Sequence, residues 1–232
     1  MRRIKFLIPL LLLFTAPASA QFMIGYNVGH CNLRELNREI YVYNKLNTTL
    51  TKEMHEIHWY QGPTIGIRTP GNVFFEFMYT RKKASTSSSF DSSGVDMKRQ
   101  VKVYGNTFNF GIGYRTDDGW GIGGSMDFGR FKGFGKRGPE ETIKDAEWKR
   151  LWVQDNTRLV GISVRLYFSA TFWVEKTFGI ATVRLYTQPM AFKQTMDGLD
   201  TWLFGAELNY AKGNDESFKN TGIAVYLNIG GK

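Results

Sequence analysis

The sequence predicts an all-β fold: an antiparallel up-and-down β-barrel of about eight strands, with one short amphipathic helix after the first strand. From residue 58 onward, bulky apolar residues alternate with small or polar residues, which indicates strands with two different faces. Short turns alternate with long connections between these segments. Aromatic residues make up 15% of the chain, which favours strands over helices.

Nine segments show this alternation. They cover residues 22–29, 62–68, 73–80, 104–114, 120–128, 160–168, 175–188, 202–210 and 223–229. Segment 175–188 changes face within its length, so we expect a register shift or a β-bulge there. Single-chain bacterial membrane barrels generally have an even number of strands. We therefore predict eight strands, with either the first segment or the one around 200–212 not crossing, and keep ten strands as the alternative.

The connections between the segments alternate in length. The short ones are TPGN at 69–72, TDDG at 116–119, and stretches at about 169–175 and 212–218. The first two carry the Pro-Gly and Asp-Gly pairs of tight turns. The long ones lie at about 30–57, 82–97, 131–155 and 189–200. Short turns on one rim and long loops on the other are typical of outer-membrane barrels.

Residues 32–47 break the strand pattern. Apolar side chains recur there every three or four residues, at Leu33, Leu36, Ile40, Tyr43 and Leu46. This spacing predicts a short amphipathic helix. Asn32 and Glu35 have the spacing of a capping box at its start.

The first twenty residues have the features of a secretory signal peptide. Arg2, Arg3 and Lys5 precede an apolar run at residues 6–14, and small residues follow at Ala18 and Ala20. We expect cleavage after Ala20, with residues 1–20 as the leader and 21–232 as the barrel domain. The apolar run is short for a membrane anchor. Cys31 lies well beyond the cleavage position, which argues against a lipoprotein. It is the single cysteine of the sequence, so an intrachain disulfide cannot form.

The second face of each strand decides between a membrane barrel and a soluble one. That face consists mostly of Gly, Ser, Thr and Asn, with a few charges, whereas a face in water would carry more Lys and Glu. We therefore expect the apolar face to meet lipid and the small polar face to line a narrow lumen. Unpaired buried charges are costly, so we predict a lumen charge network of Arg68, Glu76, Asp127, Arg165 and Glu207.

Three stretches carry a resemblance to a known group of proteins. They are PASA followed by Gln21, the strand FMIGYNVG at 22–29, and the hairpin GPTIGIR–TPGN–VFFEFMYTRKK at 62–83. With these, the chain resembles the small bacterial outer-membrane β-barrel proteins common in Bacteroidota. The resemblance covers most of the chain after the leader and implies the fold and an outer-membrane location, and many members have no known activity. The chain departs from a familiar pattern by ending in NIGGK and not in Phe or Trp.

The sequence contains weak candidates for two kinds of chemistry, and it favours neither. His30, Cys31, His55 and His58 lie close together in sequence and are weak candidates for a zinc site, but HEIH lacks the HExxH spacing. The serines of STSSSFDSS at 85–93 form a low-complexity stretch, and no motif pairs one with a histidine base. No phosphate-binding or dinucleotide motif opens a helix. We predict no cofactor and no catalytic residue.

The long connections are rich in basic residues. Lys82, Lys83, Lys136 and Arg137 represent a predicted basic rim, which would attract the phosphates of lipopolysaccharide. Nucleic acid is not an expected partner for an exported protein. The function predicted is a non-enzymatic outer-membrane barrel with a structural role, or with contacts to lipopolysaccharide or a secretion assembly. The alternatives are a membrane-embedded lipid hydrolase or acyltransferase, and a soluble lipocalin-like barrel of the periplasm.

Overall fold

The computed structural model describes residues 20–152, 157–159, 162–164, 167–191, 194–195, 203 and 215–230. Strands dominate these residues, and one helix follows the first strand. In chain order the elements are β1 (Gln21–Asn32), α2 (Arg34–Leu46), β2 (Leu50–Lys52), β3 (Trp59–Arg68), β4 (Val73–Ser92), β5 (Val95–Arg115), β6 (Trp120–Pro139), β7 (Lys149–Trp152), β8 (Thr157–Leu159), β9 (Ile162–Val164), β10 (Tyr167–Phe178), β11 (Ala181–Ala191), β12 (Gln194–Thr195), β13 (Asp215–Glu216) and β14 (Lys219–Ile229).

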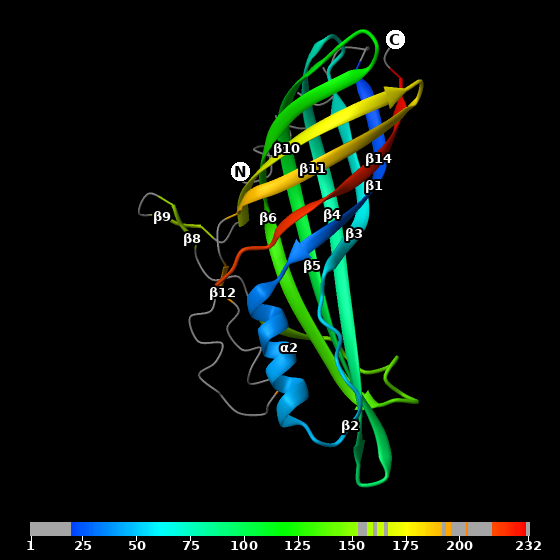
Figure 1. Ribbon diagram of the computed structural model, residues 1–232, viewed down its shortest axis with the longest axis vertical. Helices are drawn as coiled ribbons and strands as arrows, with labels where there is room; N and C mark the ends of the chain where they lie inside the picture. The colour runs from blue at the N-terminus through cyan, green and yellow to red at the C-terminus, as the bar shows by residue number, and fades with distance from the viewer. Residues whose placement is uncertain are drawn as a thin grey trace, which may run out of the picture.

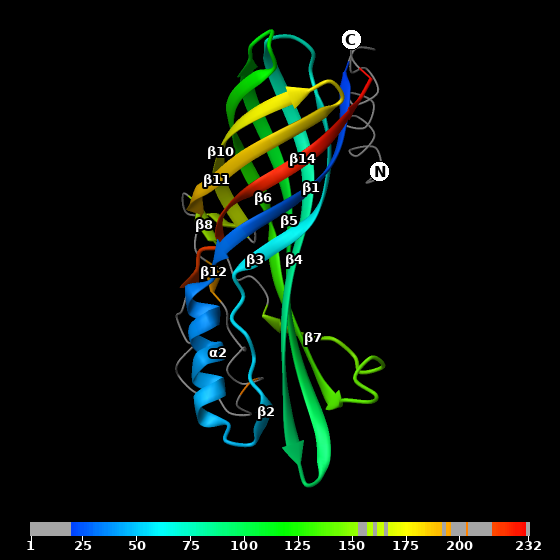
Figure 2. The same cartoon turned by 45° about the vertical axis from the view of Figure 1, so that its right-hand side comes forward.

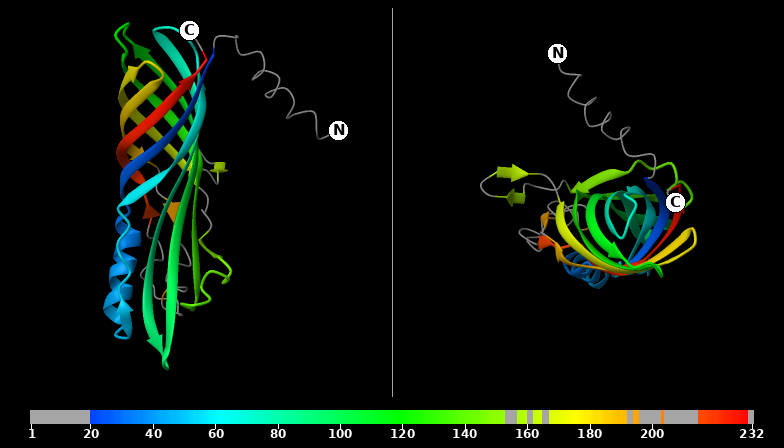
Figure 3. Two further views of the ribbon diagram at one scale, coloured as in Figure 1. Left: turned by 90° about the vertical axis from the view of Figure 1, so that its right-hand side faces the viewer. Right: turned by 90° about the horizontal axis from the view of Figure 1, so that it is seen from above.

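Eight of the described strands close into a barrel, as predicted. The path runs β10–β11–β14–β1–β3–β4–β5–β6, and β6 pairs back with β10. Every one of these pairings is antiparallel. Seven of the eight join wall strands that follow one another along the chain, as in an up-and-down meander. The eighth pairs β14, the last wall strand, with β1, the first. The ring of strands is visible from above in the right-hand view of Figure 3. Closure leaves no free edge around the barrel wall.

Two of the nine predicted segments differ from the observed strands, and a third is not tested. Segment 175–188 is not one irregular strand but two, because β10 ends at Phe178 and β11 begins at Ala181 after a turn at Gly179, whose φ is +57°. The register irregularity lies earlier, between Ala170 and Phe172, so the predicted turn at 169–175 is also wrong. Of segment 160–168, Ile162–Val164 pairs with β8 in a separate small sheet. Segment 202–210 lies outside the described residues except for Leu203.

Two predicted tight turns are confirmed. TPGN joins β3 to β4 and TDDG joins β5 to β6, with Gly71 at φ +102° and Gly119 at φ +89°. Glycine adopts these angles without steric cost, which explains why a short turn can form at these two places. Both turns lie at the same end of the barrel as the hairpin between β10 and β11, and this end also holds the start of β1 and the end of β14 (Figure 1).

The predicted loop at 82–97 is wrong, because β4 and β5 continue through it as a hairpin. Their register runs unbroken from Val73 opposite Tyr114 to Ser92 opposite Val95. β6 follows β5 as far as Met97 opposite Pro139. These three strands extend beyond the rest of the barrel, at the end away from the short turns, as a curved wall (Figures 1 and 2). The helix α2 lies against this wall. We call this part the extension: residues 81–106 and 129–139 of the three strands, with α2, β2 and β7.

The extension has its own apolar core. α2 was predicted at 32–47 and is confirmed at Arg34–Leu46, with Leu36, Ile40 and Tyr43 buried against the wall. Leu46 is 60% exposed and does not belong to this face. The wall contributes Val101, Val103 and Phe131 among others. None of the helices in the described part of the chain is long and apolar enough to cross a membrane.

The predicted capping box does not form. Leu33 occupies the N-cap of α2 and makes no side-chain capping hydrogen bond. Instead, the backbone N–H groups of Glu35 and Leu36 both donate to Oε2 of Glu216, at 3.0 and 3.2 Å. A carboxylate from a distant part of the chain therefore satisfies the free N–H groups that every helix start leaves.

Candidate functional site

The outer face of the barrel is apolar on all eight strands. Ile122 on β6 and Phe178 on β10 are both 61% exposed, and comparable side chains occur on every neighbouring strand. These side chains include Phe22, Ile24 and Tyr26 on β1, Ile65 on β3, Phe75 on β4, Phe110 and Ile112 on β5, Phe172 and Val174 on β10, Leu185 on β11, and Val225 and Leu227 on β14. The alternate residues of the same strands point inward and are of two kinds. Some are polar or charged, such as Glu76, Asp127 and Arg184, and the others form an apolar cluster of Met23, Phe74, Met78, Trp173, Tyr186, Ala224 and Tyr226. The barrel differs from a soluble protein in exposing large apolar side chains all around its outer face.

The apolar outer face ends at a row of aromatic residues on four adjacent strands. Tyr79 lies opposite Phe108, Phe108 opposite Phe128, and Phe128 opposite Phe168. The rings of Phe128 and Phe168 are 4.2 Å apart between centroids, and those of Tyr79 and Phe108 are 5.1 Å apart. We call these four residues the aromatic row. Such a row is typical of the interface between hydrocarbon and water around a membrane barrel.

Basic residues follow directly beyond the aromatic row. On β4 the next outward residues are Arg81 and Lys83, and on β6 they are Arg130 and Lys132. Arg81 and Arg130 share one row through Asn106 of β5, and Lys83 and Lys132 share the next through Tyr104. We call these four cations the basic array. It marks the side of the aromatic row that faces the extension.

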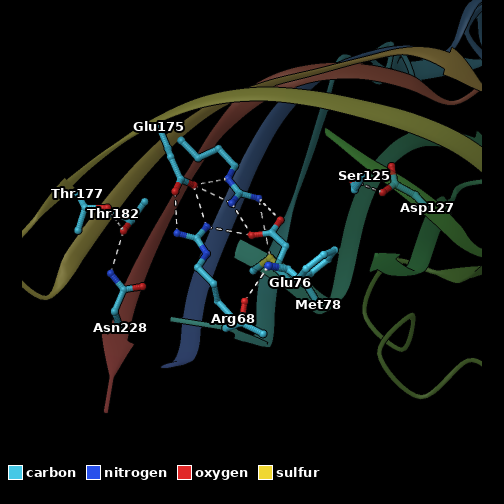
Figure 4. Close-up of polar contacts among 12 residues, drawn as sticks. Arg68, Glu76, Met78, Ser125, Asp127, Glu175, Thr177, Thr182 and Asn228 are labelled. Carbon is cyan, nitrogen blue, oxygen red and sulfur yellow. Dashed lines mark hydrogen bonds and ion pairs between the residues drawn. The ribbon is translucent and has the colours of Figure 1, made fainter. Parts of the chain in front are cut away.

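Four charged side chains fill the lumen near the end with the short turns. Arg68 donates to Glu175 at 2.7 and 2.9 Å and to Glu76 at 2.9 Å. Arg184 donates to both Glu76 oxygens, each at 2.8 Å, and to Glu175 at 2.7 and 3.0 Å. All four residues are buried, and Figure 4 shows the bonds among them. We call them the lumen quartet; its two positive and two negative charges cancel, which burial requires.

Asp127 lies apart from the quartet in a cluster of neutral donors. Its carboxylate accepts hydrogen bonds from Ser125 at 2.7 Å and from Gln188 at 2.8 Å. Three further side chains also donate to it: Asn109, Ser169 and Thr171. Asp127 is fully buried and is stabilised by these dipoles.

The predicted lumen network therefore corresponds to the structure only in part. Arg68 and Glu76 come together, Asp127 belongs to another cluster, and Arg165 and Glu207 lie outside the described residues. Sequence reasoning missed Glu175 and Arg184 because it took 175–188 for a single strand. With the turn placed at Gly179, both residues fall on the inward face, Glu175 two positions from Trp173 and Arg184 two from Tyr186.

A small cavity of about 50 Å³, lined by both polar and aromatic residues, continues from the quartet toward the extension. Asn27, Thr80, Thr107 and Asn109 contribute to its lining, together with Lys82. Toward the extension, the rings of Phe131 and Phe218 stack at 4.1 Å between centroids and belong to the apolar core there. Within the described residues the lumen is therefore filled by the quartet at one end and by aromatic packing at the other.

Two residues of the predicted basic rim are exposed and two are held by contacts within the protein. Lys82 points into the lumen, where its Nζ donates to Tyr186 at 3.0 Å and to Asn220 at 2.9 Å. Lys136 shares the outward register of Arg130 and Lys132 but is buried there, and it donates to the carbonyl of Ile143 at 2.6 Å. Lys83 and Arg137 are exposed. Because Lys82 and Lys83 lie on a strand and not in a loop, they face opposite sides of the wall, which the sequence-based prediction did not take into account.

The weak metal candidates are spread over the base of the extension. The rings of His30 and His58 stack at 5.9 Å between centroids. His55 is exposed to solvent. Cys31 is fully buried and points toward the carbonyl oxygen of Ile57 at 3.9 Å. Over the part of the chain that the structure describes, no three His, Cys, Asp or Glu side chains come close enough together to hold a metal ion.

Burial sets the pKa of two groups at this end of the molecule. Loss of solvent raises the pKa of the Cys31 thiol to about 12. Loss of solvent also raises the pKa of Glu216, although the backbone donors of α2 act in the opposite direction. The thiol therefore stays protonated and unreactive at neutral pH.

Comparison with models of known protein families finds no match, and comparison with curated proteins finds none either. Solved structures give distant likenesses. The attachment invasion locus protein Ail of Yersinia pestis, in complex with the heparin analogue sucrose octasulfate, is 9% identical with a TM-score of 0.42, over 90% of this chain and 97% of that one. Ail without the analogue gives 8% and 0.41 over the same shares. A TodX ΔS2S3 mutant, a monoaromatic hydrocarbon channel, gives 11% and 0.29 over 79% of this chain and 49% of that one. At these sequence identities and TM-scores, the solved structures do not assign a family or a function to this chain.

Proposed function

We propose that this chain is an exported outer-membrane β-barrel protein with a non-enzymatic role, either structural or in contacts with other envelope components. The observation that carries the proposal is the apolar outer face of the closed barrel, which ends at the aromatic row. Exposing so many large apolar side chains to water would be costly, whereas hydrocarbon accepts them. The leader at residues 1–20 supplies the export signal in this proposal.

The filled lumen favours a barrel without a broad pore or a ligand-binding cavity. An eight-stranded barrel is just wide enough for side chains to fill. Here the lumen quartet occupies one end, and the remaining cavity of about 50 Å³ is too small for more than a few water molecules. A soluble lipocalin-like barrel would need the opposite arrangement, with an apolar interior and a polar exterior.

The extension then lies on the cell surface. Bacterial outer-membrane barrels keep their short turns in the periplasm and their long connections outside. The turns at 69–72, 116–119 and 179–180 share one end of the barrel, and the extension with α2 occupies the other (Figure 1). The extension is therefore the part positioned to contact lipopolysaccharide or a surface assembly such as a secretion complex.

The serines that an embedded hydrolase would need lie on β4. Ser88 pairs with the hydroxyl of Tyr43 at 3.3 Å, and Ser89 donates to Glu140 at 3.3 Å. These partners tie Ser88 and Ser89 to the fold and supply neither of them with an imidazole base. Lipid A profiles of cells with and without the protein should therefore be the same by mass spectrometry, and a changed profile would favour the enzyme.

Site-specific labelling on intact cells tests the location and orientation. Ser93→Cys lies at the tip of the β4–β5 hairpin and Asp117→Cys lies in the TDDG turn, so a membrane-impermeant maleimide should label only the first. Because Cys31 is buried, the unchanged protein serves as the unlabelled control. The protein should also fractionate with the outer membrane, migrate differently on gels before and after boiling, and begin at Gln21. Recovery in the soluble periplasm would refute the proposal.

A further inference from the structure

We propose that the outer face of β4, β5, β6 and β10 carries a docking site for one lipid A unit of lipopolysaccharide. The basic array binds its phosphates, and a groove below the aromatic row holds one of its acyl chains. This inference rests on the proposed outer-membrane location and goes beyond it, because it selects one face of the barrel and one class of lipid. It also replaces the basic rim predicted from sequence with the basic array, which shares only Lys83 with that rim.

The basic array has the shape of a small rectangle. Its two rows each cross three adjacent strands, so the cations within a row are about 10 Å apart, and the rows are separated by about 7 Å along the strands. Arg81 and Lys83 are exposed on β4, as is Arg130 on β6, while Lys132 is half-buried. Among the described residues, none of the four takes part in an ion pair.

The residues between the four cations suit an anionic ligand. Asn106 lies between Arg81 and Arg130, and Tyr104 lies between Lys83 and Lys132. Both can donate hydrogen bonds to phosphate oxygens. Arg81 lies 5.3 Å from the centroid of the Tyr104 ring, which orients its guanidinium along the wall. Four cations beside two neutral donors complement a headgroup that carries more than one phosphate.

A groove of about 520 Å³ lies on the same outer face, below the aromatic row. Gly124 and Ala170 form its floor because they are small residues at outward positions. Gly124 lies opposite Ile112 on one side and Phe172 on the other, and Ala170 lies opposite Met126. These large neighbours and Phe110 form the walls. The groove is shallow, open to the surroundings of the barrel and apolar, so an extended acyl chain can lie along it.

One strand joins the two halves of the site. The outward residues of β6 run from Gly124 and Met126 in the groove, past Phe128 of the aromatic row, to Arg130 and Lys132. At about 3.3 Å per residue, the distance from Met126 to Arg130 is about 13 Å. A lipid lying along β6 therefore places its chain in the groove while its phosphates reach the array. The array lies on the extension side, which the proposed orientation assigns to the outer leaflet, where lipid A is found.

The charge half of the site is tested by lipid retention. Protein purified in detergent is mixed with bis-phosphorylated lipid A, and bound lipid is measured by native mass spectrometry. Arg81→Glu with Arg130→Glu should weaken binding by at least about thirtyfold, since two interfacial cations are lost. The matched control is Lys52→Glu with Arg137→Glu, which changes the net charge equally at exposed positions outside the array. This control should retain the lipid.

The groove half is tested separately. Ala170→Trp fills the floor and should reduce retention, whereas Val225→Trp adds similar bulk on the lipid-facing surface of β14 and should not. Dephosphorylated lipid A and phosphatidylglycerol should both bind less well than bis-phosphorylated lipid A.

Equal retention by the array variant and its charge control would overturn the phosphate site, and equal binding of phosphatidylglycerol would overturn the choice of lipid. Heat-modifiable migration is recorded for every variant. A folded, membrane-located protein that fails these tests refutes only this inference, whereas a protein absent from the outer membrane refutes the proposed function as well.

Discussion

Arg68 on β3 donates two hydrogen bonds to Glu175 on β10, at 2.7 and 2.9 Å, although the two residues are 107 positions apart. Their strands are not neighbours in the barrel wall, so the pair spans the lumen. Arg184 and Glu76 complete the quartet around them (Figure 4). Charge pairing thus ties opposite sides of the lumen together, beside the inward apolar cluster that includes Phe74, Trp173 and Tyr226.

Removing one cation of the quartet should be strongly destabilising. Arg184→Met leaves two buried carboxylates to share Arg68, and breaking a buried pair in this way costs about 3–5 kcal/mol. The double variant Arg184→Met with Glu76→Gln leaves the two-hydrogen-bond pair of Arg68 and Glu175 intact, so it should be more stable than the single variant. Urea unfolding in detergent, followed by gel migration, measures both. A double variant less stable than the single one would show that the quartet does not act as a unit.

The contribution of Asp127 to the free energy of unfolding should depend on its accepting hydrogen bonds at both carboxylate oxygens. Asp127→Asn keeps the shape but replaces one acceptor with an NH₂ group, which then faces donors such as Gln188 and Ser169. We expect a loss of about 1–3 kcal/mol in the free energy of unfolding. Ser125→Ala removes a single donor and should cost less, because four donors remain. The same unfolding assay measures both, and an Asp127→Asn protein as stable as the wild type contradicts the arrangement.

The cap of α2 should make the extension sensitive to pH. Burial raises the pKa of Glu216, so the folded protein keeps this proton to a higher pH than the unfolded chain does. Below the ordinary pKa of glutamate, Glu216 therefore does not make the free energy of unfolding depend on pH. As the pH rises through the raised pKa, this free energy decreases, and above that pKa it is again constant. Glu216→Gln keeps an acceptor for α2 without titrating, so it should remove the fall.

Hydrogen exchange of the first turn of α2 measures this effect. Wild type and Glu216→Gln are compared at matched pH between about 4 and 8, which brackets the ordinary pKa of glutamate and the region above it. Protection in the variant should exceed that of the wild type only at the higher pH. Glu216→Ala removes the acceptor and should lose about 1 kcal/mol of protection throughout. A difference between wild type and Glu216→Gln that does not change with pH would contradict the prediction.

Cys31 should be inert while the protein is folded. Its side chain is fully buried and its pKa is raised to about 12, so very little thiolate forms at pH 8. Maleimide should not modify the folded protein but should modify it completely in urea. Ser93→Cys provides an exposed thiol that should react in the folded state at the same pH. Equal rates at the two positions would show that the core around Cys31 opens readily.

The sequence predicted the parts of the fold that depend on neighbouring residues. Period-two alternation indicated the strands, Gly71 and Gly119 marked two tight turns, and the spacing of Leu36, Ile40 and Tyr43 indicated α2. The predicted number of eight strands is confirmed, but the strands are not the predicted ones, because β1 is part of the wall and segment 175–188 forms two strands. The alternation, the turns and the helix follow from local backbone geometry, which a short stretch of sequence specifies.

Only the tertiary structure decided which distant residues meet. It paired Arg68 with Glu175, capped α2 with Glu216 and turned Lys82 inward while Arg81 faces outward. It also showed that the polar stretch at 82–97 continues as strand, because register with β5 and contact with α2 stabilise it. These outcomes depend on barrel closure and strand register, which bring together residues more than a hundred positions apart. The alternation of the chain determined that one face of each strand would be apolar, and the closed barrel determined which charges lie behind that face.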